Sequence, residues 1–150
     1  MMVVKFVMMV GIAGSGKSTK AVEIAAEEGA EVIGSDSIRK ELYGDEAIHG
    51  DGQVYQVMED RTMIALRKGA SVVYDATNLV ASRRRELLAK LPAGVEKECI
   101  WVNTPIECAL QNNQSRARHV AEGVIYHQVA QLEAPIKEEG WDTIRIHTYK

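Results

Sequence analysis

The feature that most constrains this chain is a glycine-rich run between an apolar segment and a helical one. Residues 11–18 read GIAGSGKS and satisfy every fixed position of the P-loop pattern, G-x-x-x-x-G-K-[ST]. The apolar residues 3–10 predict a buried strand, and residues 18–28 have helical composition without Gly or Pro. A chance glycine-rich turn would not be expected to have both flanks. Such a loop wraps its backbone N–H groups around a phosphate at a helix N-terminus, so we predict a nucleoside triphosphate site.

The P-loop residues have different expected roles at that site. Lys17 should reach the β- and γ-phosphates, and the Ser18 hydroxyl should bind Mg²⁺. The guanine-recognition pattern Asn-Lys-x-Asp does not occur in the sequence, which favours ATP as the nucleotide. We therefore predict ATP and Mg²⁺ as cofactors. The residues predicted to bind the nucleotide are Gly11, Ala13, Gly14, Ser15, Gly16, Lys17, Ser18 and Thr19.

Short apolar segments alternate with helical ones along the rest of the chain. This alternation predicts an α/β fold, with a parallel sheet covered by helices on both faces in one three-layer domain, residues 1–150. The polar residues 44–52 are expected to form a loop. After the strand at 3–10, we expect strands at 31–34, 70–75, 97–102 and 143–147. Helices are expected at 18–28, 35–43, 53–68, from Asn78 or Ser82 to Lys90, 105–116 and 122–132.

Composition and charge exclude several classes of protein. The longest apolar run is far shorter than the roughly 20 residues that cross a bilayer, and the N-terminus has no signal-peptide pattern. The net charge of −3 argues against broad binding to duplex nucleic acid. Cys99 and Cys108 lack metal-ligand spacing and are interpreted as reduced thiols. These features predict a cytoplasmic protein with no membrane partner, and they do not indicate its oligomeric state.

Two acids follow predicted strands, at the edge of the sheet where parallel α/β proteins bind ligands. Asp75 ends the strand at 70–75, where a carboxylate can hold Mg²⁺ or position an acceptor, although many strands end in Asp only to form a turn. Asp36 follows the strand at 31–34 and could cap the next helix or act as a general base. Arg39 lies three residues later on the same helical face, where it could pair with Asp36 or hold a phosphate of the substrate. Spacing alone does not decide between these roles.

Two groups of basic residues stand out further along the chain. Arg116 and Arg118 follow a nearly neutral helix, where a mobile turn could bring one of them to a transferring phosphoryl group. The run of three arginines at 83–85 is interpreted instead as a solvated helix face. Thr77 and Asn78 directly follow Asp75 and either bind substrate or form a turn.

Four segments occur in an informative order: GIAGSGKST, SDSIRKELYG, VVYDATNL followed by SRRRELL, and NNQSRARHVAEGVI. This series resembles the P-loop kinase group that contains the phage-type polynucleotide 5′-kinase domain and related small bacterial kinases. The resemblance covers residues 3–132. It implies a five-stranded parallel sheet of order 2-3-1-4-5 with a short lid.

The resemblance also implies roles for individual residues. Asp36 matches the general base, Arg39 the arginine that holds the phosphate of the acceptor, and Arg116 the lid arginine at the transferred phosphate. Lys17 and Ser18 match the residues that hold the triphosphate and its Mg²⁺. Three further positions match the segment beside the acceptor: Asp75, which is also expected to hold the metal, Thr77 and Asn78. Arg118 is expected to contact the nucleotide.

The chain departs from this group at two points of the lid segment. Relatives have Arg-Asn where this chain has Asn112 and Asn113, which removes a positive charge near the triphosphate. They have Val-Pro where this chain has Val120 and Ala121. The phosphatase domain that accompanies the phage kinase is also not part of this sequence.

Three functions agree with these residues. The first is an ATP-dependent kinase that phosphorylates a hydroxyl, at a 5′-OH polynucleotide end or on a nucleotide-like acceptor. The second is a kinase of a small hydroxylated metabolite, which would use the same catalytic residues. The third is a nucleotide-binding switch that hydrolyses ATP slowly and acts through a partner. An acid and an arginine at the acceptor side favour the first two.

Overall fold

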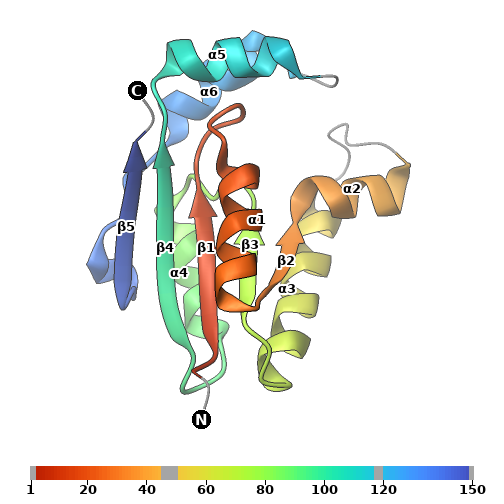
Figure 1. Ribbon diagram of the computed structural model, residues 1–150, viewed down its shortest axis with the longest axis vertical. Coiled ribbons are helices and arrows are strands. Elements are labelled where there is room, and N and C mark those ends of the chain that lie inside the picture. The colour runs from red at the N-terminus through yellow and green to blue at the C-terminus, as the bar shows by residue number, and fades with distance from the viewer. Residues whose placement is uncertain (1–2, 45–50, 117–119, 149–150) are drawn as a thin grey trace.

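A computed structural model of the chain describes residues 3–44, 51–116 and 120–148 (Figure 1). Strands and helices alternate along it, as the sequence predicts. The strands are β1 (Lys5–Val10), β2 (Glu31–Gly34), β3 (Val72–Asp75), β4 (Glu96–Asn103) and β5 (Thr143–Thr148). The helices are α1 (Lys17–Glu28), α2 (Ser35–Tyr43), α3 (Asp51–Arg67), α4 (Ala81–Lys90), α5 (Ile106–Ser115), α6 (Glu122–Gln131) and a short 3₁₀ helix, η1 (Lys137–Glu139).

The five strands form one parallel sheet in the order β2-β3-β1-β4-β5, which confirms the predicted fold class. β1 lies at the centre and is almost fully buried after its first residue, Lys5. A central strand of a parallel sheet is covered on both faces, so it needs a continuous apolar run rather than an alternating one. The sequence Phe6–Val10, FVMMV, meets that need.

Helices cover both faces of the sheet, as Figure 1 shows. The side chains of Phe6, Met8 and Val10 pack with residues of α3 and α4 on one face. Val7 and Met9 point to the opposite face and pack against α1. α5 and α6 lie across the carboxyl ends of the strands, where Ala109 and Ile125 join a third apolar cluster with residues of the P-loop. This third cluster fixes the helices that border the ligand edge.

Two local predictions are wrong. The loop expected at residues 44–52 extends too far, because α3 already begins at Asp51; residues 45–50 of that range lie outside the described residues. Neither Asn78 nor Ser82 caps α4, because Val80 occupies the N-cap position and no side chain caps the helix. Asn78 has a different role, in which its side-chain amide donates 2.7 Å to the Met9 carbonyl. α2 opens at Ser35 as expected, but its N-cap is Gly34.

The three arginines of α4 do not all lie on a solvated face. Arg84 is 1% exposed, and its guanidinium donates to both carboxylate oxygens of Glu139 in η1, at 2.7 and 2.8 Å. The Glu139 carboxylate also accepts a bond from the Trp141 indole at 3.0 Å. This cluster ties the segment after α6 to α4, whereas Arg83 and Arg85 are exposed as predicted. Among the described residues, no helix is long and apolar enough to cross a membrane.

Candidate active site

The structure brings three of the predicted motifs together at the carboxyl edge of the sheet. The P-loop leaves β1, Asp36 lies two residues after the end of β2, and Asp75 is the last residue of β3. Asp75 is in register with Met9 of β1 and with Gly34 of β2. Because these three strands are neighbours and parallel, residues far apart in sequence meet at one edge.

The backbone of the P-loop adopts the conformation that its glycines allow. Gly14 and Gly16 have positive φ values of 79° and 92°. Gly14 also lies under α5, where a Cβ atom would come within 2.3 Å of the Ala109 carbonyl oxygen. Gly16 is the N-cap of the 12-residue helix α1, and no side chain caps its first turn. The free N–H groups of that turn, together with the helix dipole, favour an anion at this point.

Three side chains from the carboxyl edge brace the P-loop backbone. Gln128 of α6 accepts the N–H of Ala13 at 2.8 Å. The Asn112 amide of α5 donates to the Gly14 carbonyl at 2.9 Å. The Thr104 hydroxyl donates to the Ser15 carbonyl at 2.7 Å. Asn112 stands at the position where the related kinases carry an arginine. In this chain, its side chain therefore binds the backbone of the P-loop.

The atoms expected to hold Mg²⁺ and the triphosphate fit that role. The Ser18 hydroxyl donates to Asp75 Oδ2 at 2.9 Å. Asp75 Oδ1 and Ser15 Oγ are buried and have no hydrogen-bond partner among the described residues. Mg²⁺ prefers oxygen ligands and takes few from protein when phosphates supply the others. The described residues contain no cluster of three or more His, Cys, Asp or Glu that could hold a metal.

Two ionisable side chains of this region are shifted toward their neutral forms. Burial raises the pKa of Asp75, although Lys17 and the Ser18 hydroxyl act in the opposite direction. Burial likewise lowers the pKa of Lys17, against the attraction of Asp75 and Asp36. Both charges are therefore incompletely compensated by the protein. A bound Mg²⁺ and phosphate would supply the missing partners.

Asp36 and Arg39 form the second half of the site. The Arg39 guanidinium donates from Nη1 to Asp36 Oδ1 at 2.8 Å and from Nε to Asp51 Oδ1 at 3.0 Å. Arg39 is largely buried, whereas the Asp36 side chain is 43% exposed. The predicted Asp36–Arg39 pair is therefore present, and its second carboxylate comes from the start of α3.

Two cavities meet around these groups. One, of about 580 Å³, is lined by residues 14–19 with Asn112 and Arg116. The other, of about 380 Å³, is lined by Lys17 and Ser18 of the P-loop and by Asp36 and Arg39 of α2. Arg116 is exposed and lines both. The arrangement places a phosphate site and a carboxylate–arginine pair on the two sides of one space.

The remaining predicted residues lie at the border of this space or outside the described residues. Thr77 lines the cavity that contains Asp36, and its carbonyl accepts the N–H of Gly11 at 3.1 Å. Asn78 has a positive φ of 49°, and its side-chain amide donates to the carbonyls of Met9 and Ala76. These bonds stabilise the turn after β3. Arg118 lies in residues 117–119, which are not among those described.

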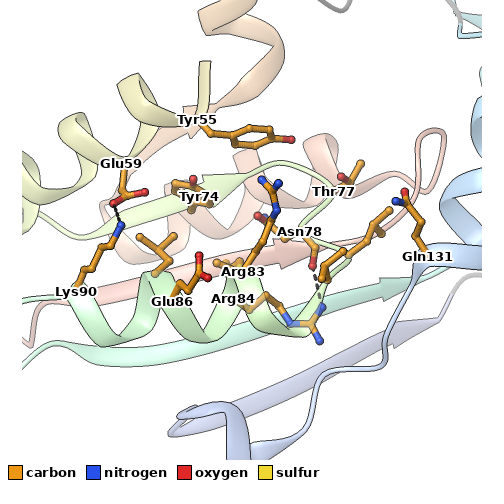
Figure 2. Close-up of a pocket in the computed structure, with 14 residues that line it drawn as sticks. Tyr55, Glu59, Tyr74, Thr77, Asn78, Arg83, Arg84, Glu86, Lys90 and Gln131 are labelled. Atoms are coloured by element: carbon orange, nitrogen blue, oxygen red, sulfur yellow. Dashed lines mark hydrogen bonds and ion pairs between the residues drawn. The ribbon is translucent and has the colours of Figure 1, made fainter. Parts of the chain in front are cut away.

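A third cavity, of about 290 Å³, adjoins the acceptor side and lies between α3 and α4 (Figure 2). Tyr55, Thr77, Leu79 and Gln131 line both this cavity and the one that contains Asp36. Its floor is formed by Met8 and Tyr74 of the sheet. We call it the α3–α4 pocket.

Sequence reasoning missed several residues of the site. Asp51 lies in a segment expected to be a loop, and Gln128 lies on a helix to which no motif was assigned. No local pattern identifies either, because their partners are 12 and 115 residues away in sequence. Asn112 was noted only as a departure from the related group. Tyr55 is one apolar position of a long helix, and nothing in the sequence separates it from the others.

Solved structures with similar folds include kinases of several kinds. A sugar kinase from Janibacter sp. HTCC2649 is 19% identical, with a TM-score of 0.75 over 97% of this chain and 85% of that chain. Shikimate kinase from Acinetobacter baumannii is 18% identical, with a TM-score of 0.62 over 99% of this chain and 86% of that one. At these identities the likeness shows the fold alone.

A chain of the Pnkp1/Rnl/Hen1 RNA repair complex is 21% identical, with a TM-score of 0.75. The match covers 88% of this chain but 45% of that chain, so this chain spans less than half the length of that relative. A search of curated proteins found no match. The family model described as AAA domain matches residues 6–135, most of the chain, and this protein therefore belongs to that family of P-loop proteins.

Proposed function

We propose that this protein is a kinase that transfers the γ-phosphoryl group of ATP to a hydroxyl group, with Asp36 as the general base. The observation that carries the proposal is a single cavity lined both by Asp36, held by Arg39, and by Lys17 and Ser18 of the P-loop. A nucleotide switch would need the phosphate site but not a carboxylate on the opposite side. The acid and arginine therefore favour transfer to an acceptor.

Each residue has a distinct part in the proposed reaction. The acceptor oxygen attacks the γ-phosphorus, the bond to the β–γ bridging oxygen breaks, and ADP leaves. Asp36 aligns the acceptor hydroxyl and accepts its proton. Lys17 and Arg116 bring positive charge to the phosphate oxygens from the P-loop and from the end of α5. Mg²⁺, when held by Ser18 and Asp75, would neutralise the phosphates.

We infer that the acceptor is a 5′-OH polynucleotide end or a nucleotide-like molecule. Support comes from the resemblance of the Asp36, Arg39 and Asp75 segments to the polynucleotide 5′-kinase group. The fold similarity to a chain of an RNA repair complex agrees with this inference. An acceptor of this kind offers the primary 5′-hydroxyl of its sugar, which a partly exposed carboxylate such as Asp36 can reach.

A small hydroxylated metabolite is the second candidate acceptor. The cavity that contains Asp36 measures about 380 Å³, which lies within the usual range of small-molecule pockets. A sugar kinase and a shikimate kinase have similar folds. The catalytic residues would be unchanged, and only the contacts with the rest of the acceptor would differ.

The proposal is tested by transfer of labelled γ-phosphate from ATP with Mg²⁺ to 5′-OH oligonucleotides and to a panel of small hydroxylated acceptors. We expect Asp36→Asn to lower kcat by about 10²–10⁴-fold, because the amide cannot accept the proton. ATP affinity should stay within about twofold, since P-loop contacts are unaffected. Glu41→Gln is the matched control, because Glu41 is an exposed carboxylate on the same helix.

The outcomes separate the alternatives. Label on the oligonucleotide that is lost in Asp36→Asn supports the polynucleotide acceptor and the base together. Label on a small molecule alone keeps the mechanism and replaces the acceptor. Near-normal turnover in Asp36→Asn would falsify the role of the base. ATP binding with no label on any acceptor would favour the nucleotide-binding switch.

A further inference from the structure

The α3–α4 pocket continues the acceptor side of the site. Four residues line both this pocket and the cavity around Asp36, so a molecule with its hydroxyl at Asp36 can extend into it. In Figure 2, Thr77 and Gln131 lie toward one end of the pocket, and Lys90 and Glu59 lie at the other. The group that enters the pocket would be the part of the acceptor that is attached to the reacting hydroxyl.

Arg39 is poorly placed to hold an anionic group of the acceptor. Its guanidinium already donates to two carboxylates, Asp36 and Asp51, from two different nitrogens. One positive charge therefore faces two negative ones in a largely buried setting. A phosphate brought to Arg39 would have to displace Asp51 or meet two like charges at close range, which is unfavourable. Arg39 fits better as the residue that positions Asp36.

The cations that line the α3–α4 pocket differ in how they are engaged. Arg84 is buried and bonded to Glu139 and to the carbonyls of Asn78 and Glu133. Lys90 pairs with Glu59 at 2.8 Å. Arg83 makes no hydrogen bond or ion pair with any residue that the structure describes, and its guanidinium extends from α4 toward Tyr55 in Figure 2. Arg83 can therefore bind an anion without giving up another contact.

We propose that Arg83 binds a phosphate of the acceptor in the α3–α4 pocket while the acceptor hydroxyl lies at Asp36. This inference rests on the proposed function and narrows it to acceptors that carry both a hydroxyl and a phosphate. A nucleoside 3′-phosphate and a 5′-OH oligonucleotide share that chemistry. The planar guanidinium can donate two parallel bonds to phosphate oxygens, which a lysine could not match. Tyr55 offers an aromatic face beside the same path.

Binding and kinetics of the full chain test the inference with uridine 3′-phosphate, uridine and a 5′-OH hexanucleotide. We expect Arg83→Gln to raise the Kd and KM of the two phosphate-bearing molecules about tenfold, with kcat within about twofold. Uridine should be unaffected. Arg85→Gln is the matched control, because Arg85 is exposed on the same helix and does not line the pocket. It removes the same charge and should change none of these values.

Several results would overturn the inference. These are an equal loss in Arg83→Gln and Arg85→Gln, an unchanged Kd in Arg83→Gln, or wild-type binding of uridine 3′-phosphate no tighter than that of uridine. If Arg83→Gln weakens binding of uridine 3′-phosphate alone, Arg83 binds a terminal phosphate. If it also weakens binding of the hexanucleotide, Arg83 binds an internal phosphodiester as well. Arg83-dependent binding of uridine 3′-phosphate, without label transfer to any acceptor, would support the phosphate site and contradict the kinase activity. The two proposals therefore fail separately.

Discussion

The charged residues of the P-loop region are held in surroundings that suit the bound state better than the free one. Burial moves the pKa of Asp75 up and that of Lys17 down, so each is charged at a cost near neutral pH. Asp75 Oδ1 also has no hydrogen-bond partner among the residues described. Charged groups that are buried without full compensation lower the stability of the ligand-free protein. Such groups are typical of binding sites, where a bound ligand supplies the missing partners.

Asp75→Asn should therefore stabilise the ligand-free protein. A carboxyl whose pKa is raised in the folded state favours folding when protonated, and this contribution is lost as pH rises from the unfolded value of 3.8 through the folded pKa. At pH 7 the buried charge opposes folding, and the amide removes it. We expect a gain on the order of 1 kcal/mol, or about 2–4 °C in Tm, together with a large loss of Mg²⁺-dependent turnover.

Thermal unfolding from pH 3 to 8 provides the measurement. The gain over wild type should shrink as pH falls and the wild-type carboxyl becomes protonated. Asp60→Asn, an exposed carboxylate on α3, serves as control and should leave Tm within about 1 °C. A lower Tm in Asp75→Asn at pH 7 would contradict the argument.

The limits of sequence reasoning are clearest for individual residues. The P-loop and Asp75 were found because their neighbours in sequence form a strand–loop–helix or end a strand. Asp36 was found as a candidate, but only resemblance chose between a cap and a base. Asp51 was not assigned a role and Arg84 was wrongly placed on a solvated face, because their roles depend on Arg39 and Glu139, which reach them through tertiary contacts. The sequence of three consecutive arginines does not indicate whether one of them is buried.

Among the elements, α4 and η1 are joined by a buried ion pair that also shapes the site. Arg84 bonds to Glu139 in η1 and to the Asn78 carbonyl in the turn after β3. Burial disfavours the Glu139 carboxylate, but bonds from Arg84 and Trp141 outweigh this effect and hold its pKa below the usual value. The pair therefore links the segment after α6 to the turn that contains Thr77 and Asn78.

Breaking this pair from one side should be costly. Arg84→Met leaves the Glu139 carboxylate buried without its partner, and we expect a loss of about 3–5 kcal/mol in the free energy of unfolding. Urea unfolding at pH 7 measures it. Arg85→Met, on the same helix but exposed, should change stability by less than about 0.5 kcal/mol. Equal effects of the two substitutions would show that the pair contributes nothing particular.

The pH dependence gives a second reading of the same pair. Because the pKa of Glu139 is lowered in the folded state, its contribution is present above the unfolded value of 4.5 and is lost as pH falls through the folded pKa. Wild-type stability should therefore fall more steeply below about pH 4.5 than that of Glu139→Gln. Parallel acid unfolding curves for the two proteins would contradict this assignment.

Element types were easier to predict than element ends. All five strands lie close to where the sequence predicts them. Burial explains the apolar runs of β1 and β3, whereas the edge strand β5 is largely exposed and alternates apolar with polar residues. The start of α3 was missed by two residues, and the cap of α4 was misplaced. Both errors concern polar residues that could serve a helix or another partner equally well, such as Asn78 with Met9.

For the whole molecule, the resemblance implied the sheet order, which local sequence alone does not determine. The order β2-β3-β1-β4-β5 puts the P-loop strand between the strand that carries Asp75 and β4. α5 and α6 then close over the edge and contact the P-loop through Asn112 and Gln128. Nucleotide binding is therefore expected to stabilise the fold as a unit, rather than one loop.

Addition of ATP and Mg²⁺ should raise Tm. At about 100 times Kd, ligand linkage gives about 2.7 kcal/mol, which corresponds to roughly 5–10 °C for a domain of this size. Differential scanning fluorimetry measures the shift. Lys17→Met should abolish most of it, because the phosphates would lose the lysine of the P-loop. Lys20→Met, on the same helix but not among the residues that line the cavity, should retain it. An equal shift in both variants would place the nucleotide elsewhere.

The central position of β1 also has a consequence for synthesis on the ribosome. Phe6 pairs with Val72 of β3, and Lys5 with Glu96 of β4, so the first strand made waits for partners 66 and 91 residues later. At about 5–20 residues per second, that wait lasts on the order of 5–20 s. During this time α1 can cover only Val7 and Met9, and the side chains of Phe6, Met8 and Val10 lack the later residues that bury them. We therefore expect the nascent chain to depend on chaperones more than the folded protein does.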